Sequence, residues 1–489
     1  MPEHPFHGRS ELRGLTPLMR SSFPEGRFGR MFRNLRPLLP PSAALEALAR
    51  QMFEPEPQPG EEDDPTKDNP DLPAGFTYFG QFVDHDLTFD PTSQLQRDND
   101  PNALHNFRTS AFDLDSIYGR GPDDQPFLYE HDGIRFLLGK NAAGEDDLSR
   151  NTKGRALLGD PRNDENLIVA QLTLGILKYH NQVVGTPFIA ALPEDQRFDE
   201  ARRIVRWHFQ WAVVHDFLAR LVGNDVIDDI LQPDSFKVPA GPTANTVRSH
   251  RVVRKFFHWK NHPFMPVEFA VGAYRFGHSM VRGEYELNAK VQNIPIFAKE
   301  PAEDLRGFRA LPVGHVIEWA RFFSFRGSTL ETQPSRKIDS KLAFGLSILP
   351  GDVAKGIHDL AERDLKRGKA LGLPSGQDIA RAMGIPEDLI LHEKDLSSLP
   401  RDLVKLFGEQ TPLFFYVLKE AEVFSKGRRL GPVGGRIVAE VFLGLLQGDP
   451  SSYLRVQPSF RPKAGEFGAP RDGEFTVQDL LRFARVTIG

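Results

Sequence analysis

The chain has 489 residues, of which 40% are hydrophobic and 26% charged, and its formal net charge is -5. This length allows a large core in one to three domains, and the mild acidic charge gives no reason to expect nucleic acid as a partner. Cysteine is absent, which excludes disulfides, thiolate metal sites and a cysteine nucleophile.

The amino terminus, MPEHPFHGRSELRGLTPLMR, contains no apolar segment typical of a secretion signal. No window reaches the roughly 18 uncharged apolar residues that a membrane span needs. We therefore expect a soluble, cytoplasmic protein with no membrane span. The sequence does not indicate the oligomeric state, although any dimer of a chain without cysteine is non-covalent.

The first part of the chain, residues 1–74, is interpreted as an arm that packs on the body. Its end lies in FEPEPQPGEEDDPTKDNPDLPAG, residues 53–75, whose acidic and proline-rich composition is typical of a surface loop. The rest, residues 75–489, is expected to form one large domain.

Helical periodicity dominates this domain. Apolar residues recur at three-to-four spacing in the segments 165–184, 200–223, 266–282 and 433–447. Strand signals are short and sparse, and the 42 glycines and 39 prolines predict long connections. The sequence therefore predicts a mainly α fold with one large, irregular helical domain.

The segment QFVDHDLTF, residues 81–89, places three titratable side chains side by side in an apolar setting. On a helix, consecutive residues point about 100° apart, so Asp84, His85 and Asp86 would face three directions and need three different partners. Alone, such a triplet is more often a surface cluster or a generic metal site.

Four further segments follow in an order that makes this triplet specific. Together they resemble the animal-type haem peroxidases, the family within the peroxidase–cyclooxygenase superfamily that includes myeloperoxidase and lactoperoxidase. The segments are RTSAFDLDSIYG (108–119), DPRNDENL (160–167), YRFGHSMV (274–281) and DLKRGKALGLP (364–374). The resemblance covers roughly residues 75–375, implies a helical fold with haem b buried between central helices, and together with the missing cysteines favours a bacterial member.

The resemblance implies three catalytic residues. His85 falls on the distal histidine, which moves a proton between the oxygens of hydrogen peroxide. Arg162 falls on the distal arginine, whose permanent charge stabilises the separating oxygen. Gln81, one helical turn before His85, falls on the distal glutamine and should face the same cavity.

Two carboxylates match positions that form haem esters in the family, Asp84 and Glu165. Asn166 stands where the best-known member has a methionine that forms a third, sulfonium link, so that link is excluded. Free carboxylates near the haem, or an ordinary ion pair of Arg162 with Glu165 on a helix surface, are the alternatives to the ester interpretation.

Asp86 is implied to bind calcium. Its partners in the resemblance are Thr109, Ala111, Asp113 and Asp115, which offer the hard oxygen ligands that this cation prefers. Calcium there would hold the helix that carries His85.

His278 matches the proximal iron ligand, although alone it would more often be a satisfied core histidine. The family usually has an asparagine where this chain has Asp364, and a carboxylate there would give His278 more imidazolate character and lower the reduction potential. The same segment has Ala370 and Leu371 in place of the family's Asp-His pair.

The resemblance implies a peroxidase that reacts with hydrogen peroxide, forms compound I, and oxidises small organic donors, halides or thiocyanate. Bromide, iodide and thiocyanate are favoured over chloride because the sulfonium link is missing. A fatty-acid dioxygenase is the first alternative, but it needs a tyrosine three residues before His278, where this chain has Arg275. A haem-free binding or structural protein is the second alternative. It is disfavoured because Gln81, His85, Arg162 and His278 are all present together.

Overall fold

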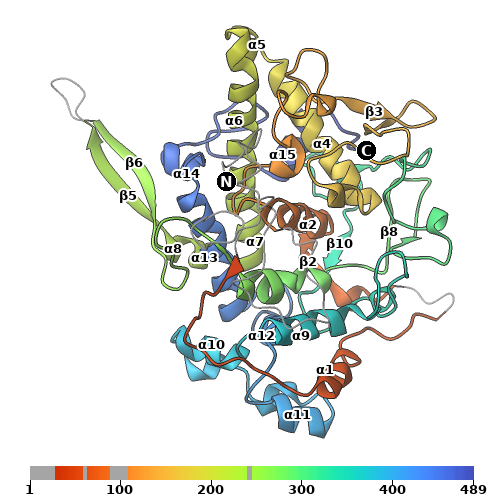
Figure 1. Cartoon of the computed structure of the whole chain (residues 1–489), viewed down its shortest axis with the longest axis vertical. Helices are drawn as coiled ribbons and strands as arrows, with labels where there is room; N and C mark the ends of the chain where they lie inside the picture. Colours follow the sequence, from red (N-terminus) through yellow and green to blue (C-terminus); the bar gives the residue numbers. More distant parts are fainter. Residues whose placement is uncertain (1–27, 59–62, 89–107, 239–244) are drawn as a thin grey trace, which may run out of the picture.

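Helices form the centre of the structure, a computed structural model that describes residues 28–58, 63–88, 108–238 and 245–489 (Figure 1). The first 27 residues of the predicted amino-terminal arm lie outside the described part. The mainly α prediction is confirmed. The α-helices are α1 (Ser42–Ala49), α2 (Gly75–Leu87), α3 (Asp115–Tyr118), α4 (Leu167–Val184), α5 (Pro187–Ala190), α6 (Glu194–Ala212), α7 (Ala219–Val222), α8 (Asn224–Ile230), α9 (Leu360–Ala370), α10 (Gly376–Ala382), α11 (Arg401–Phe407), α12 (Leu413–Ser425), α13 (Pro432–Gly448), α14 (Tyr453–Val456) and α15 (Val477–Phe483).

The strands are short and pair only two at a time within the described residues. They are β1 (Phe28–Gly29) with β7 (Met265–Pro266), β2 (Asp68–Pro73) with β10 (Pro334–Arg336), β3 (Leu138–Lys140) with β4 (Asp146–Leu148), β5 (Leu231–Val238) with β6 (Asn245–Val252), and β8 (Glu284–Tyr285) with β9 (Ile294–Pro295). The β5–β6 hairpin projects from the body (Figure 1).

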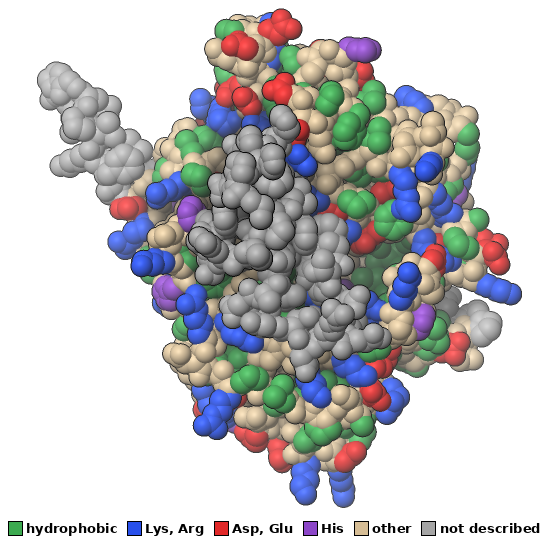
Figure 2. Space-filling view, in the orientation of Figure 1, with side chains coloured by type: hydrophobic (Ala, Val, Ile, Leu, Met, Phe, Trp, Pro, Cys, Tyr) green, Lys and Arg blue, Asp and Glu red, His purple; other side chains and the backbone are tan. Residues whose placement is uncertain are grey.

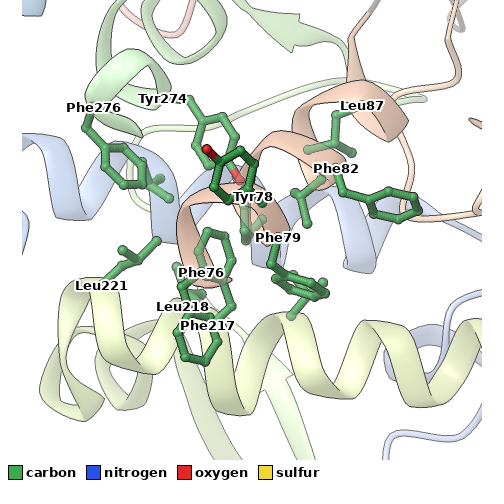
Figure 3. Packing of buried hydrophobic residues seen from close by; sticks show 14 of the residues in the cluster. Phe76, Tyr78, Phe79, Phe82, Leu87, Phe217, Leu218, Leu221, Tyr274 and Phe276 are labelled. Atoms are coloured by element: carbon green, nitrogen blue, oxygen red, sulfur yellow. The ribbon is translucent and has the colours of Figure 1, made fainter. Parts of the chain in front are cut away.

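Aromatic rings fix the position of α2 against the long helix α6 and its continuation. Phe79 meets Phe209 edge-on at 5.8 Å and Phe217 at 5.4 Å, and Phe76 stacks on Phe217 (Figure 3). Each fully buried phenylalanine contributes roughly 1.5–3 kcal/mol, and edge-to-face pairs add to this. The packing therefore fixes the rotation of α2, and with it the directions in which residues 84–86 point.

Three of the four predicted helices are confirmed in position. The segment 165–184 becomes α4, which begins after Asn166, whose side chain accepts hydrogen bonds from the backbone N–H groups of Ile168 and Val169. The segment 200–223, except its last residue, lies within α6, a π-helical turn over Val213–Leu218 and α7. The segment 433–447 lies within α13.

The prediction of a regular α-helix over residues 266–282 is wrong. The chain instead forms a π-helical turn, η7 (Glu268–Gly272), followed by a 3-10 helix, η8 (Ala273–His278). Between them Gly272 has φ -111° and ψ -86°, outside the helical region, and a Cβ there would lie 2.7 Å from Leu413. Close packing against α12 therefore interrupts the helix just before His278.

The loop predicted over 53–75 is partly a strand. β2 pairs antiparallel with β10, and the buried guanidinium of Arg336 bonds Asp68 at 2.6 Å. Such pairing between distant segments leaves no periodic signal in a proline-rich stretch. The described part of residues 1–74 contacts the body through β1, α1 and β2; its division from residues 75–489 stays a prediction.

Acidic and basic side chains are interspersed over the face of the molecule shown in Figure 2. Among the described residues, no helix has both the length and the apolar composition required to cross a membrane.

Candidate active site

A cavity of about 190 Å³ lies between α2 and η8. Figure 3 shows aromatic side chains from both elements, of which Phe76, Tyr78, Tyr274 and Phe276 line this cavity. Its lining consists of Phe76, Thr77, Tyr78, Gly80, Gln81, Asp84, His85, Glu165, Phe217, Tyr274, Arg275, Phe276, Gly277, His278, Met280 and Val281. The structure thus brings Gln81, Asp84, His85, Glu165 and His278 together, as the sequence predicts.

His85 is 3% exposed, and both of its ring nitrogens face oxygen atoms. Nδ1 lies 2.9 Å from Oδ1 of Asn163, and Nε2 lies 3.2 Å from Oε1 of Glu165. These contacts orient the ring from both ends and place a carboxylate within proton-transfer distance of Nε2. Asn163 is a site residue that the sequence analysis missed; its position next to Arg162 was the available signal.

Gln81 shares that carboxylate with His85. Its Nε2 donates a short hydrogen bond to Oε1 of Glu165, and its Oε1 accepts from Nδ2 of Asn166 at 3.0 Å. Asn166 was interpreted only through the methionine it replaces. In the structure it orients Gln81 and also begins α4.

Arg162 does not line the cavity among the described residues. Its Nη2 bonds Oδ2 of Asp160 at 2.8 Å and donates to the backbone carbonyls of His85, at 3.0 Å, and Thr88. Burial by itself would raise the pKa of Asp160, but Arg162 and Arg108 outweigh it and hold that pKa well below its usual range. Arg162 therefore fixes the end of α2 from behind the cavity.

Arg275 supplies a cationic side chain to the cavity wall. Its Nη1 lies 3.6 Å from Oδ2 of Asp84, and its Nε donates to the carbonyl of Ala270 at 2.9 Å. Asp84 also accepts from Oγ1 of Thr88 at 3.1 Å. The sequence analysis used Arg275 only to argue against a tyrosine, and so missed its pairing with Asp84.

His278 faces the same cavity from η8, with Asp364 behind it. Its Nδ1 lies 2.6 Å from Oδ2 of Asp364, a residue of α9 that is 9% exposed. A carboxylate oxygen accepts in this contact when Nδ1 is the donor, and in the neutral form of that tautomer the lone pair lies on Nε2. Nε2 has no hydrogen-bond partner within the described part of the chain, and a Cβ on neighbouring Gly277 would meet open space.

Asp86 points in the third direction. It accepts hydrogen bonds from the N–H groups of Leu114 at 3.0 Å and Ser116 at 3.3 Å, and it forms with Asp113 and Asp115 a group whose oxygens lie within 4.8 Å of one another. We call these three acids the carboxylate cluster.

The three acids of the carboxylate cluster repel one another, and a bound cation would relieve this repulsion. Burial, followed by the charges of Asp113 and Asp115, raises the pKa of Asp86 well above its usual value. Thr109 lies close, since its Oγ1 donates to Asp113 at 2.7 Å, and Ala111 lines the same adjoining cavity as Thr109 and Asp113.

The chain is similar in sequence to proteins named as peroxidases. The chain is 27% identical over 307 residues to chorion peroxidase of Drosophila melanogaster, covering 60% of this chain and 34% of the relative. It is 23% identical over 387 residues to thyroid peroxidase of Sus scrofa, covering 71% and 38%. The chain thus spans little more than a third of the length of these relatives.

Solved structures show the same fold at low identity. Peroxidase A from Dictyostelium discoideum superposes with a TM-score of 0.59 at 18% identity, covering 88% of this chain and 87% of that one. A fatty acid alpha-dioxygenase of Arabidopsis thaliana gives 0.56 at 14% identity, covering 93% and 75%. The profile described as animal haem peroxidase matches residues 93–461, well over half of the chain, and the chain therefore belongs to the animal haem peroxidase family.

Proposed function

We propose that this chain is a peroxidase that binds haem b and takes hydrogen peroxide as its oxidant. The observation that carries the proposal is the placement of His85 and His278 on opposite elements of one cavity, with Asp364 fixing the tautomer of His278. With a phenolic donor, two donor molecules each give one electron and one proton, and the peroxide becomes two water molecules. With bromide, iodide or thiocyanate, the anion gives two electrons and takes up one peroxide oxygen, and with one proton from solution the products are HOX and one water molecule.

The donor set fits haem. His278 lines the cavity and would bind the iron through Nε2, and Asp84 and Glu165 line it as candidates for ester links. When bound, haem supplies the redox-active iron at which peroxide is reduced. Seating it requires Glu165 to leave Nε2 of His85, because the carboxylate stands where a ligand of that nitrogen would lie.

The polar residues of α2 handle the protons. Nε2 of His85 accepts the proton of the bound peroxide and returns it to the departing oxygen. The amide of Gln81 donates to Glu165 in the same cavity and would donate to the peroxide once that carboxylate has left. Arg162 keeps His85 in place through the carbonyls at the end of α2. Calcium in the carboxylate cluster would hold that helix from its other side.

The test is an absorption spectrum of the haem-loaded full chain before and after one equivalent of hydrogen peroxide. The Soret band should fall and shift within seconds, and recover when a phenol or bromide is added. His85→Ala should keep the haem spectrum and lose the fast reaction, whereas His278→Ala should change the spectrum before peroxide is added. A wild-type band that ignores peroxide contradicts the proposal.

A fatty-acid dioxygenase stays the second candidate because Tyr274 lines the cavity. Its hydroxyl donates to the carbonyl of Gly80 at 3.2 Å, and burial, followed by the charge of Asp84, raises its pKa well above the usual value. Oxygen uptake with linoleate distinguishes the two functions. Uptake that disappears in Tyr274→Phe would favour the dioxygenase, and no uptake would favour the peroxidase.

A further inference from the structure

Arg108 connects the carboxylate cluster to the loop that carries Arg162. Its side chain is buried, at 3% exposure, and its Nη1 bonds Oδ1 of Asp115 at 3.2 Å. Its other edge bonds Oδ2 of Asp160, at 2.9 Å from Nε and 2.6 Å from Nη2. The planar guanidinium thus joins two buried carboxylates.

Asp160 is the shared anion of this arrangement. It is fully buried and pairs with both Arg108 and Arg162. Its Oδ1 also accepts the backbone N–H of Arg162 at 2.8 Å, which caps the 3-10 turn η5 (Pro161–Asp164). A change in the charge felt by Asp160 therefore reaches both the side chain and the backbone of Arg162.

The contacts close into a ring. Arg162 bonds the carbonyl of His85 on α2, and the next residue on that helix, Asp86, belongs to the carboxylate cluster. Because Arg108, Asp115, Asp160 and Asp86 are buried and Arg162 is 22% exposed, water and salt screen most of these charges weakly. Binding of a cation at one point should therefore be felt around the whole ring.

We infer that Arg108 is a positioning residue, which transmits cation binding at the carboxylate cluster to Arg162 through Asp160. A cation competes with Arg108 for Asp115 and repels its guanidinium, so the hold of Arg108 on Asp160 strengthens. This tightens η5 and orders Arg162 against the end of α2. The proposed peroxidase function is not required for this coupling.

The backbone offers a competing route. The N–H of Asp160 donates to the carbonyl of Ser116 at 2.7 Å, next to Asp115, so a cation could order η5 without Arg108. A variant that removes the guanidinium and leaves this backbone bond intact separates the two routes.

The test is hydrogen–deuterium exchange of the full chain, with and without haem, in calcium and in chelator. In the wild type, calcium should slow exchange across both 109–116 and 160–166, by about fivefold or more in the second segment. In Arg108→Met, calcium should still protect 109–116, while its effect on 160–166 should fall to a factor near one. Equal protection of 160–166 in this variant, or no calcium effect in the wild type, would overturn the inference.

Arg150→Met is the matched control. The side chain of Arg150 is only 10% exposed and likewise bridges two carboxylates, Asp147 at 3.1 Å and Asp164 at 2.7 Å, but these acids lie outside the carboxylate cluster. Arg150→Met should keep the calcium effect on 160–166.

If Arg108→Met does not fold, Arg108→Lys replaces it, because a single ammonium cannot present two edges to Asp115 and Asp160. Its calcium effect on 160–166 should be smaller than in the wild type, and an equal effect would overturn the inference. If the chain shows this pattern of hydrogen–deuterium exchange but does not react with peroxide, the proposed function is contradicted and the inferred coupling is supported.

Discussion

At the scale of single residues, Asp364 behind His278 has the clearest chemical consequence. It stands where the resemblance predicts an asparagine. The bond from Nδ1 to Asp364 is 2.6 Å long, and a charged acceptor binds an N–H more strongly than a neutral amide does. The extra negative charge would stabilise the more oxidised form of an iron held at Nε2. The residue therefore favours a lower reduction potential than an asparagine would.

Asp364→Asn should raise the reduction potential of the haem iron by about 60 mV, which corresponds to a tenfold change for one electron. Redox titration of the Soret band measures it. Glu362→Gln, on the same helix but paired with Lys366, is the control and should leave the potential unchanged. An unaltered potential in Asp364→Asn would contradict the proposed role of the carboxylate.

Glu165 cannot both form an ester with haem and stay in contact with His85 as a free carboxylate, because an ester carries no charge. If peroxide turnover links the haem, acidified organic solvent should extract it before turnover and fail afterwards. Glu165→Gln should then retain haem only through Asp84, and mass spectrometry of the haem peptide shows which bonds form. Haem that stays extractable from the wild type after turnover would show that Glu165 forms no ester.

At the scale of elements, the start of α2 has no room for a side chain. A Cβ at Gly75 would overlap the ring of Phe323 and lie 2.6 Å from the carbonyl oxygen of Phe322. Gly75→Ala should therefore cost about 1–3 kcal/mol in urea unfolding. The control is Gly185→Ala at the end of α4, where φ is -72° and the nearest atom lies at 3.5 Å; it should be neutral or slightly stabilising. A small loss in Gly75→Ala would show that Phe323 can move aside.

The junction of α12 with α13 predicts a pH dependence. Glu420 is fully buried and accepts the N–H groups of Val433 and Gly434, and burial raises its pKa from 4.5 to about 8. Between those values the unfolded chain has lost a proton that the folded chain keeps, so the free energy of unfolding falls as pH rises, by at most roughly 1.4 kcal/mol per unit.

Glu420→Gln should flatten this slope between pH 5 and 8, as followed by urea unfolding at each pH. Exposed Glu409→Gln is the control and should keep the wild-type slope. A parallel shift of the whole curve in Glu420→Gln, without a change in slope, would show that the carboxyl ionises normally in the fold.

At the scale of the whole molecule, the carboxylate cluster connects α2 to the segment that begins at Arg108. A cation that binds only the folded chain should stabilise it by about 2.7 kcal/mol at a hundredfold excess over Kd. Calcium should therefore raise the unfolding temperature, and chelator should reverse the rise. Asp113→Asn should abolish the effect, while Asp123→Asn, an exposed acid nearby, should preserve it. A calcium response that survives in Asp113→Asn would place the cation elsewhere.

The sequence by itself determined the fold class, the positions of α4, α6 and α13, and the divergent directions of residues 84–86. These follow from local periodicity and helix geometry, which are properties of neighbouring residues. It also identified His85, Glu165 and His278 as members of one site, through motifs that occur in a fixed order.

Tertiary structure alone decided how those residues are connected. Gly272 interrupts the helix before His278 because α12 packs against it, and β2 forms because a strand more than 260 residues away pairs with it. The placement of Arg162 behind the cavity likewise depends on Asp160 and Arg108, whose charges meet only in the folded chain. Local patterns predict elements, but contacts between distant segments set the geometry of the site, because those contacts depend on packing that no short window of sequence contains.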